Sequence, residues 1–162
     1  MDKRSLIEQL AASLRRTAQV AEHAEHDAAT AARDGATPAE KREDARVALE
    51  QQSLAKGHGR RVEKARTEIA ALEAFRPPVL GQGARIAVGA IVEIEDGEEG
   101  RTLFLAPVGA GVELTGPGGD GFLSVVTPAS PIGRAVLGRR RGETVEVEVR
   151  GEARAWRITE VL

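Results

Sequence analysis

The 162-residue sequence contains no cysteine. This absence excludes disulfides, cysteine-based zinc sites and thiol catalysis, and it fits a reducing cytoplasm, where we expect the protein to be located. Aromatic residues are also scarce, since Phe75, Phe104, Phe122 and Trp156 are the whole set. A platform that stacks unpaired bases needs several aromatic side chains on one face. We therefore expect no readout of single-stranded nucleic acid.

Neither sign of charge dominates the chain. It has 23 Lys and Arg against 25 Asp and Glu, for a formal net charge of -2 at pH 7. No global basic field marks nucleic acid as a partner, so we expect no sequence-specific nucleic-acid binding. No apolar run approaches the ~18 residues that span a bilayer, and the start MDKRSLIEQL lacks the apolar core of a signal peptide. We expect neither a membrane partner nor export.

Proline and glycine are nearly absent from the first half of the chain. Residues 1–75 hold one of the seven prolines and three of the 18 glycines. The composition changes at FRPPVLGQG (Phe75–Gly83), where two consecutive prolines cannot continue a helix. We therefore predict a first domain over residues 1–76, a linker over 77–84 and a second domain over 85–162.

The first domain has the residue spacing of an antiparallel helical hairpin with its tip at about residues 34–38. Apolar and small residues recur in alternating steps of three and four on both sides of this tip, which is the pattern of a coiled-coil seam. Near the tip the seam is almost wholly alanine, so the two helices should approach closely there. The predicted seam positions are Ile7, Leu10, Leu14, Thr17, Ala21, Ala24, Ala28 and Ala31, then Ala48, Gln51, Ala55, His58, Val62, Ala65, Ile69 and Leu72.

The turn DGATPAEKRED (Asp34–Asp44) carries the signals of two helix ends. Gly35 suits the left-handed residue that follows a first helix. Thr37, Pro38 and Glu40 match the N-cap, the first helical position and the third residue of a capping box in a second helix. These matches favour a structural role for Glu40.

The second domain alternates polar and apolar residues, as strands do, with glycine-rich turns between them. The segment SPIGRAVLG predicts a short helix that Ser130 caps, with Pro131 at its first position. The predicted fold class is therefore α+β, with a helical hairpin followed by a small antiparallel sheet and one short helix. The predicted strands are Arg85–Glu95, Arg101–Val108, Phe122–Thr127, Thr144–Arg150 and Ala153–Leu162.

No self-contained active site is evident. All three histidines fall in the predicted hairpin, so no Ser–His–Asp set can form around an oxyanion pocket. His23 and His26 lie three residues apart, but a third metal ligand is not evident, and His58 fits a polar seam residue that sets register. GPGGDG (Gly116–Gly121) is interpreted as a hairpin loop. GRRRG (Gly138–Gly142) is a basic turn that could contact a phosphate or an acidic partner, although a solvated turn is favoured.

Two segments resemble Gre-type bacterial transcription elongation factors. TPASPIGRAVLGRRRGETVEVEV (Thr127–Val149) is similar to that family's C-terminal signature, which runs S-P-x-G-x-A-L-x-G, then G-D/E and a V-x-V strand. LEQQSLAKGHGRR (Leu49–Arg61) resembles the second helix of the family's coiled coil, including its Glu-Gln-Gln. The order of parts agrees over essentially the whole chain. The resemblance implies a coiled-coil hairpin followed by an FKBP-like sheet domain.

The resemblance also implies a partner and a mechanism. Gre-type factors dock their C-terminal domain on the rim of the secondary channel of bacterial RNA polymerase and pass the hairpin toward its active site. There, two tip carboxylates in a D-x-x-E pattern help to hold a second Mg²⁺. We therefore expect a monomer that binds RNA polymerase, is not itself an enzyme, and uses no cofactor beyond Mg²⁺ shared with the polymerase. The implied docking residues are Ser130, Pro131, Ile132, Gly133, Arg134 and Leu137.

The tip departs from the family pattern. Counted back from the Glu-Gln-Gln motif, the family's Asp falls on Pro38 and its Glu on Lys41, and neither residue binds Mg²⁺. We expect a polymerase-binding regulator without efficient stimulation of transcript cleavage. The alternatives are an active cleavage factor with displaced acids, an FKBP-like chaperone or isomerase, and a coiled-coil adaptor; the scarcity of aromatics argues against the chaperone. The candidate tip contacts are Asp34, Glu40, Lys41, Glu43 and Asp44.

Overall fold

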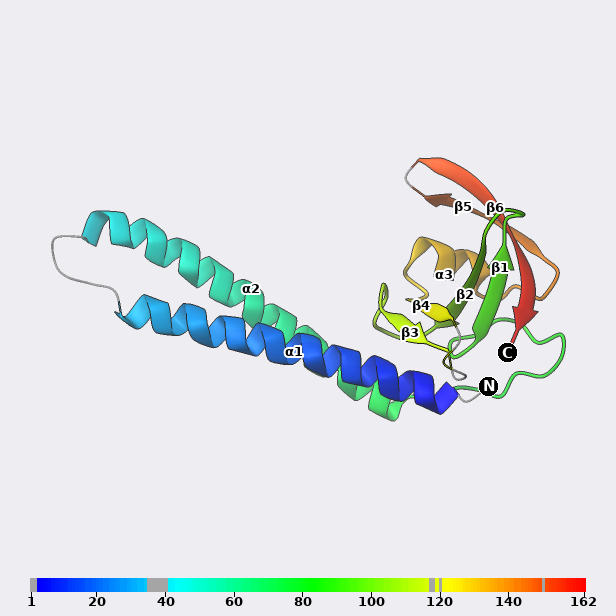
Figure 1. Cartoon of the computed structure of the whole chain (residues 1–162), viewed down its shortest axis with the longest axis horizontal. Helices are drawn as coiled ribbons and strands as arrows, with labels where there is room; N and C mark the ends of the chain where they lie inside the picture. The colour runs from blue at the N-terminus through cyan, green and yellow to red at the C-terminus, as the bar shows by residue number, and fades with distance from the viewer. Residues whose placement is uncertain (1–2, 35–40, 117–118, 120, 150) are drawn as a thin grey trace. The chain divides into compact units, whose positions relative to one another are not determined.

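A computed structural model describes residues 3–34, 41–116, 119, 121–149 and 151–162 (Figure 1). By its internal contacts the chain forms two compact units. One comprises Met1–Ala11 and Ala71–Leu162, and the other Ala12–Ala70. Within the described ranges, no helix is both long and apolar enough to cross a membrane. The linker over residues 77–84 stays a prediction.

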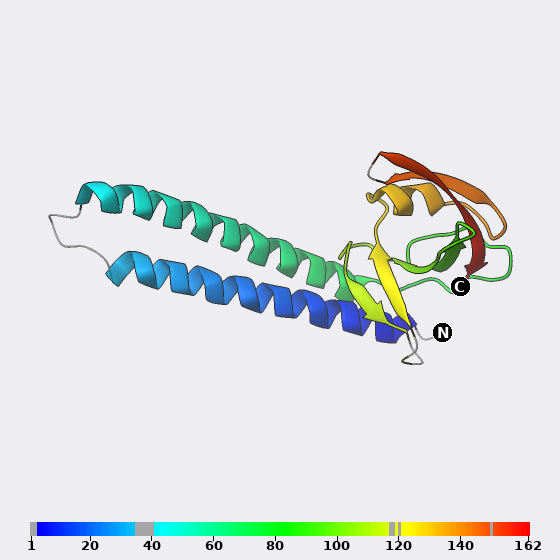
Figure 2. The same cartoon turned by 45° about the horizontal axis from the view of Figure 1, so that its top comes forward.

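Two long helices form the hairpin. Helix α1 spans Lys3–Asp34 and helix α2 spans Lys41–Ala74, with 32 and 34 residues. They run antiparallel and side by side in both views (Figures 1 and 2). At a rise of ~1.5 Å per residue, each helix is roughly 50 Å long. An ion pair joins them, because Arg66 Nη2 lies 2.8 Å from Glu22 Oε1. The predicted helical hairpin is confirmed.

The buried stripe of α1 differs from the predicted seam at two positions. Ile7 is only half-buried, whereas its neighbour Leu6 is fully buried. Thr17 is exposed, whereas its neighbour Ala18 is buried. The buried positions therefore step by four from Leu10 to Leu14 and to Ala18, then by three to Ala21. This spacing is closer to the 3.6-residue period of a straight helix than to the 3.5 of a supercoil. The assignment of Thr17 to the seam was wrong for that reason.

The other described domain is built on one six-stranded sheet with strand order β3-β4-β2-β1-β6-β5. Neighbouring strands are antiparallel except β2 and β4, which are parallel. The α+β prediction is confirmed, but the sheet is mixed rather than wholly antiparallel. The strands are β1 Ile91–Glu95, β2 Gly100–Leu105, β3 Glu113–Thr115, β4 Phe122–Val126, β5 Thr144–Val149 and β6 Glu152–Val161.

Two local differences from the predicted strands have physical causes. Strand β1 begins at Ile91 rather than Arg85, because Gly89 has a φ of 98° and leaves the extended conformation. A Cβ at Gly89 would lie 2.7 Å from Pro78 Cδ, so the close approach of the preceding chain requires glycine there. The sequence pattern also missed β3, whose three residues are too short to show an alternation.

The first turns of α1 belong to the same unit as the sheet. The Gln9 side-chain amide donates to Thr115 O at 3.1 Å, and its carbonyl oxygen accepts from Thr115 N at 3.0 Å. Because β3 is an edge strand, this pair satisfies backbone groups that would otherwise be open to another chain. Lys3 Nζ donates to Pro78 O at 3.0 Å. Partial burial lowers the pKa of Lys3.

Trp156 and the strands around it form the core of the sheet domain. The Trp156 side chain is 1% exposed and Phe104 is fully buried. The Arg101 guanidinium lies over the Trp156 ring, 5.2 Å from its centroid. The core cluster comprises Ile86, Ala90, Val92, Ile94, Leu103, Leu105, Val126, Val136, Val145, Val147, Trp156 and Ile158.

Asp96 fixes the turn between β1 and β2. Its Oδ1 accepts from the backbone N–H groups of Glu99 and Glu98 at 2.8 and 3.1 Å. These hydrogen bonds, with a smaller effect of the nearby Arg154 guanidinium, lower the pKa of the Asp96 carboxyl.

The short helix α3 spans Pro131–Val136 and has the predicted cap. Ser130 Oγ accepts from Gly133 N at 3.2 Å and donates to Thr127 O at 2.8 Å, with Pro131 in the first turn. Gly133 is packed against this cap. A Cβ at Gly133 would lie 2.0 Å from Thr127 O and 2.7 Å from Ser130 Oγ.

We predict that Gly133→Ala destabilises the protein by roughly 1–3 kcal/mol, since the new methyl group must displace backbone. Thermal denaturation of the full chain measures the effect. Gly81→Ala is the matched control, because a Cβ at Gly81 would meet no atom within 4 Å. Equal melting temperatures for the two variants would contradict the close packing at α3.

Candidate functional site

The residues around α3 are the first candidate surface. Ser130 caps the helix, and Gly133 is a buried residue of the helix itself. Ile132 is half-buried against the core cluster. Pro131 is exposed, and so is Leu137, whose exposure of 40% is high for a large apolar side chain.

The six predicted docking residues fall into two groups, those exposed to solvent and those that hold α3 in place. Arg134 is exposed, and its Nη2 donates a hydrogen bond to Ala129 O at 3.1 Å. Pro131, Arg134 and Leu137 are available to a partner, whereas Ser130, Ile132 and Gly133 hold the helix in place. Sequence spacing alone did not separate these two roles.

The hairpin tip is the second candidate surface, and only part of it is described. Asp34 is the last residue of α1, and Lys41 is the first of α2. Glu43 and Asp44 lie in the first turn of α2, offset by about 100° around the helix axis. The predicted cap of Thr37, Pro38 and Glu40 lies outside the described residues.

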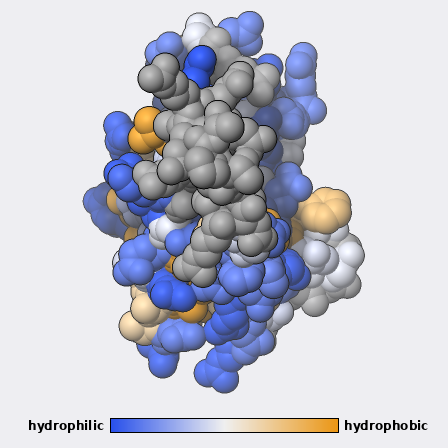
Figure 3. Space-filling model, turned by 90° about the vertical axis from the view of Figure 1, so that its left-hand side faces the viewer, coloured by the Kyte–Doolittle hydropathy of each residue, from blue (hydrophilic) through white to orange (hydrophobic). Residues whose placement is uncertain are grey.

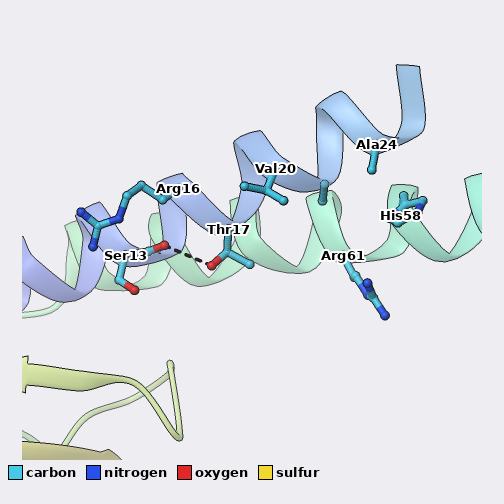
Figure 4. Close-up of a pocket in the computed structure, with 8 residues that line it drawn as sticks. Ser13, Arg16, Thr17, Val20, Ala24, His58 and Arg61 are labelled. Carbon is cyan, nitrogen blue, oxygen red and sulfur yellow. Dashed lines mark hydrogen bonds between the residues drawn. The ribbon is translucent and has the colours of Figure 1, made fainter. Parts of the chain in front are cut away.

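A groove between the helices is the third candidate (Figure 4). It is an open groove with a volume of about 350 Å³, and it is lined in part by Val20, which is 70% exposed. The guanidinium groups of Arg16 and Arg61 point away from each other in Figure 4, so they do not converge on an anion. Its lining residues are Ser13, Arg16, Thr17, Val20, Ala21, Ala24, His58 and Arg61.

His58 contributes an unusual polar atom to the hairpin. Its Nδ1 is buried and has no hydrogen-bond partner within the described part of the chain. The predicted seam position of His58 agrees with its partial burial. In the portion that the structure describes, no three His, Asp or Glu side chains are arranged to hold a metal ion, and this includes the region of His23 and His26.

The two glycines beside His58 have no packing reason to be glycine. A Cβ at Gly57 would meet no atom within 4 Å, and one at Gly59 would make an ordinary contact with Glu25 Oε1 at 3.5 Å. Glycine costs about 1 kcal/mol relative to alanine in a helix interior. The middle of α2 is therefore less stable than the same helix would be with alanine at positions 57 and 59.

We predict that Gly57→Ala raises the free energy of unfolding of the hairpin by about 1 kcal/mol. Urea denaturation followed by far-UV circular dichroism measures the change. The reverse substitution at another exposed position of α2, Ala70→Gly, should lower stability by a similar amount. A neutral or destabilising Gly57→Ala would mean that α2 is not continuous through this residue.

The surface offers little support for a chaperone or isomerase. Trp156 and Phe104 are buried in the core, so neither side chain lines a surface pocket. Phe122, which is 74% exposed at the start of β4, is the large exposed aromatic among the described residues. Outside the grey atoms, the face in Figure 3 is mostly hydrophilic, with a few hydrophobic spots.

The described chain combines a long antiparallel helical hairpin with a six-stranded mixed sheet and a capped helix α3. A family model described as "Transcription elongation factor, GreA/GreB, C-term" matches residues 82–162, which is half of the chain. The chain therefore belongs to the GreA/GreB family of transcription elongation factors.

Two curated relatives carry the name of this family. The chain is 28% identical over 116 residues to the transcription elongation factor GreA of Polaromonas naphthalenivorans, covering 72% of this chain and 68% of the relative. It is 27% identical over 101 residues to GreA of Verminephrobacter eiseniae, covering 62% and 60%. Among solved structures it is similar to the GreA factor homolog 1 (Gfh1) protein of Thermus thermophilus, with 21% identity, 98% and 93% coverage and a TM-score of 0.40. Factors of this family act with RNA polymerase and are accessory proteins rather than enzymes.

Proposed function

We propose that this protein binds RNA polymerase through the secondary channel and regulates elongation or initiation without efficiently stimulating transcript cleavage. Family membership supports the choice of partner. The composition of the hairpin tip supports the loss of cleavage activity. The regulation then depends on where the hairpin lies rather than on a metal ion that it delivers.

The tip residues carry the second part of the proposal. At the two positions where the family has its D-x-x-E carboxylates, this chain has Pro38 and Lys41. Mg²⁺ prefers hard oxygen ligands, and a two-metal site needs carboxylates that reach the same ion. The Pro38 ring and the Lys41 ammonium group supply no oxygen ligand for Mg²⁺.

The remaining acids near the tip are poor substitutes. Glu43 and Asp44 are adjacent in α2, and their offset of about 100° around the helix does not favour a joint clamp on one ion. Lys41 and Arg42 add two positive charges at the start of the same helix. They raise the energy of a nearby Mg²⁺, although salt screens part of this repulsion.

The hairpin itself suits entry into a narrow channel. Most buried side chains of its described middle part are small, since Ala18, Ala21 and Ala65 are buried there together with the larger Val62. Small side chains let two helix axes come close, at the expense of buried apolar area. A thin pair of helices occupying the channel can block substrate entry or bias a mobile element of the polymerase.

We predict little or no stimulation of RNA cleavage when the protein is added to backtracked transcription complexes. The double variant Pro38→Asp/Lys41→Glu restores the family carboxylates and should raise the cleavage rate. Gel analysis of shortened transcripts measures both. Strong cleavage by the unmodified protein that is lost in Asp34→Ala, Glu43→Ala or Asp44→Ala would establish the alternative, an active factor with displaced acids.

We further predict that Leu137→Asp weakens binding to RNA polymerase by about tenfold or more, since an exposed apolar anchor is replaced by a charge. Leu137 is the informative position because its side chain is 40% exposed, whereas Ile132 packs against the core. Co-sedimentation with polymerase measures binding, and circular dichroism verifies the fold. Val79→Asp is the control, because Val79 is 99% exposed outside α3. If a folded Leu137→Asp protein binds as well as the control, the docking surface lies elsewhere.

A further inference from the structure

Five exposed arginines gather around α3 and the segment that follows it. Backbone hydrogen bonds hold this segment against the chain before β1, since Ile86 N donates to Arg139 O and Gly138 N donates to Ile86 O, both at 2.8 Å. The basic turn GRRRG is therefore part of a fixed surface. We define the arginine surface as Arg85, Arg134, Arg139, Arg140 and Arg141.

Three of these guanidinium groups are oriented by neutral acceptors. Arg85 Nη1 donates to Gly138 O at 3.0 Å, and Arg140 Nη1 donates to Gly83 O at 2.9 Å. Arg134 donates to a backbone carbonyl in the same way. A carbonyl oxygen positions a guanidinium without cancelling its charge, and each group keeps further N–H donors for a partner.

The charge of the arginine surface is only partly balanced. Arg139 Nη1 lies 3.6 Å from Glu143 Oε1, and Arg141 Nη1 lies 3.3 Å from Glu160 Oε2. Both pairs are solvent-exposed and contribute little to stability. Five arginines against these two carboxylates leave a formal local charge of +3, in a chain whose net charge is -2.

The composition of the surface favours a protein partner over a nucleic acid. Leu137 provides an exposed apolar side chain between Arg134 and Arg139 in the sequence. Exposed apolar side chains and arginines are both enriched at the energetically important parts of protein interfaces. Residues 130–143 contain no aromatic side chain on which a base could stack.

We propose that the arginine surface docks on an acidic protein surface, a cluster of carboxylates on RNA polymerase next to the site that receives α3. This inference rests on the proposed function and names the chemistry of the partner. Guanidinium groups bind carboxylates through paired hydrogen bonds that an ammonium group cannot reproduce. Charges at the rim of an interface mainly accelerate association.

The test compares two triple variants of the full chain with the same change in charge. Arg134→Gln/Arg139→Gln/Arg141→Gln removes three charges of the arginine surface and leaves the Arg85 and Arg140 hydrogen bonds in place. The control is Arg76→Gln/Arg154→Gln/Arg157→Gln, which neutralises three exposed arginines of the same unit outside that surface. Equal melting temperatures would show that both triple variants are folded.

The measurement is the association rate constant with RNA polymerase core enzyme at low and high salt. We expect the first triple variant to associate roughly tenfold more slowly at low salt, with the difference shrinking at high salt, and the control to stay within about twofold of the unmodified protein. Equal association rates for the two triple variants would overturn this inference and leave the proposed function intact. Failure of the unmodified protein to bind polymerase would overturn both.

A short single-stranded RNA serves as a second probe in the same experiment. We expect the first triple variant and the control to behave alike toward this RNA. If the first triple variant loses RNA binding while its association with polymerase is unchanged, the arginine surface binds nucleic acid and the inference is wrong.

Discussion

The close packing of α1 and α2 through small side chains is the constraint on which the proposed function of the hairpin depends. Ala18, Ala21 and Ala65 are at most 8% exposed, yet each contributes little apolar area at ~25 cal/mol per Å². The large buried side chains of α1, such as Leu6 and Leu10, lie in its first turns. The hairpin therefore gains much less hydrophobic stabilisation around Ala18, Ala21 and Ala65 than in those first turns. Gly57 and Gly59, beside His58, lower the stability of α2 further.

The sheet domain holds the short helix α3 through several local contacts. The Ser130 cap and the packing of Gly133 against Thr127 fix α3, and the burial of Val136 ties it to the core. Because these contacts use one side of α3, Leu137 and Arg134 stay exposed. Strand β4, which precedes α3, lies inside the sheet because it pairs with β2 on one side and with β3 on the other. These contacts fix the positions of the exposed Arg134 and Leu137 relative to the sheet.

The sequence predicted the features that local chemistry determines. Ser130 and Pro131 specify a helix start within a few residues, and both long helices follow from side-chain periodicity. Thr17 was assigned to the seam because a strict heptad was assumed, whereas the helix continues at its own period and buries Ala18. The pairing of β2 with β4 joins segments about twenty residues apart in the chain, and no local pattern encodes it. At the candidate site, the segment SPIGRAVLG was enough to predict α3. Which of its apolar residues are exposed depends on tertiary packing, which buries Ile132 in part and leaves Leu137 exposed.

Site-specific photo-crosslinking tests most directly the central claim that the hairpin works inside the polymerase. A photoreactive amino acid would replace Leu54, which is 59% exposed on α2, and in a second variant Leu137, which is exposed beside α3. Mass spectrometry would locate the crosslinks on RNA polymerase. The account predicts that position 54 crosslinks to residues lining the secondary channel and position 137 to its rim. Crosslinks from position 137 to the rim without any from position 54 inside the channel would contradict it.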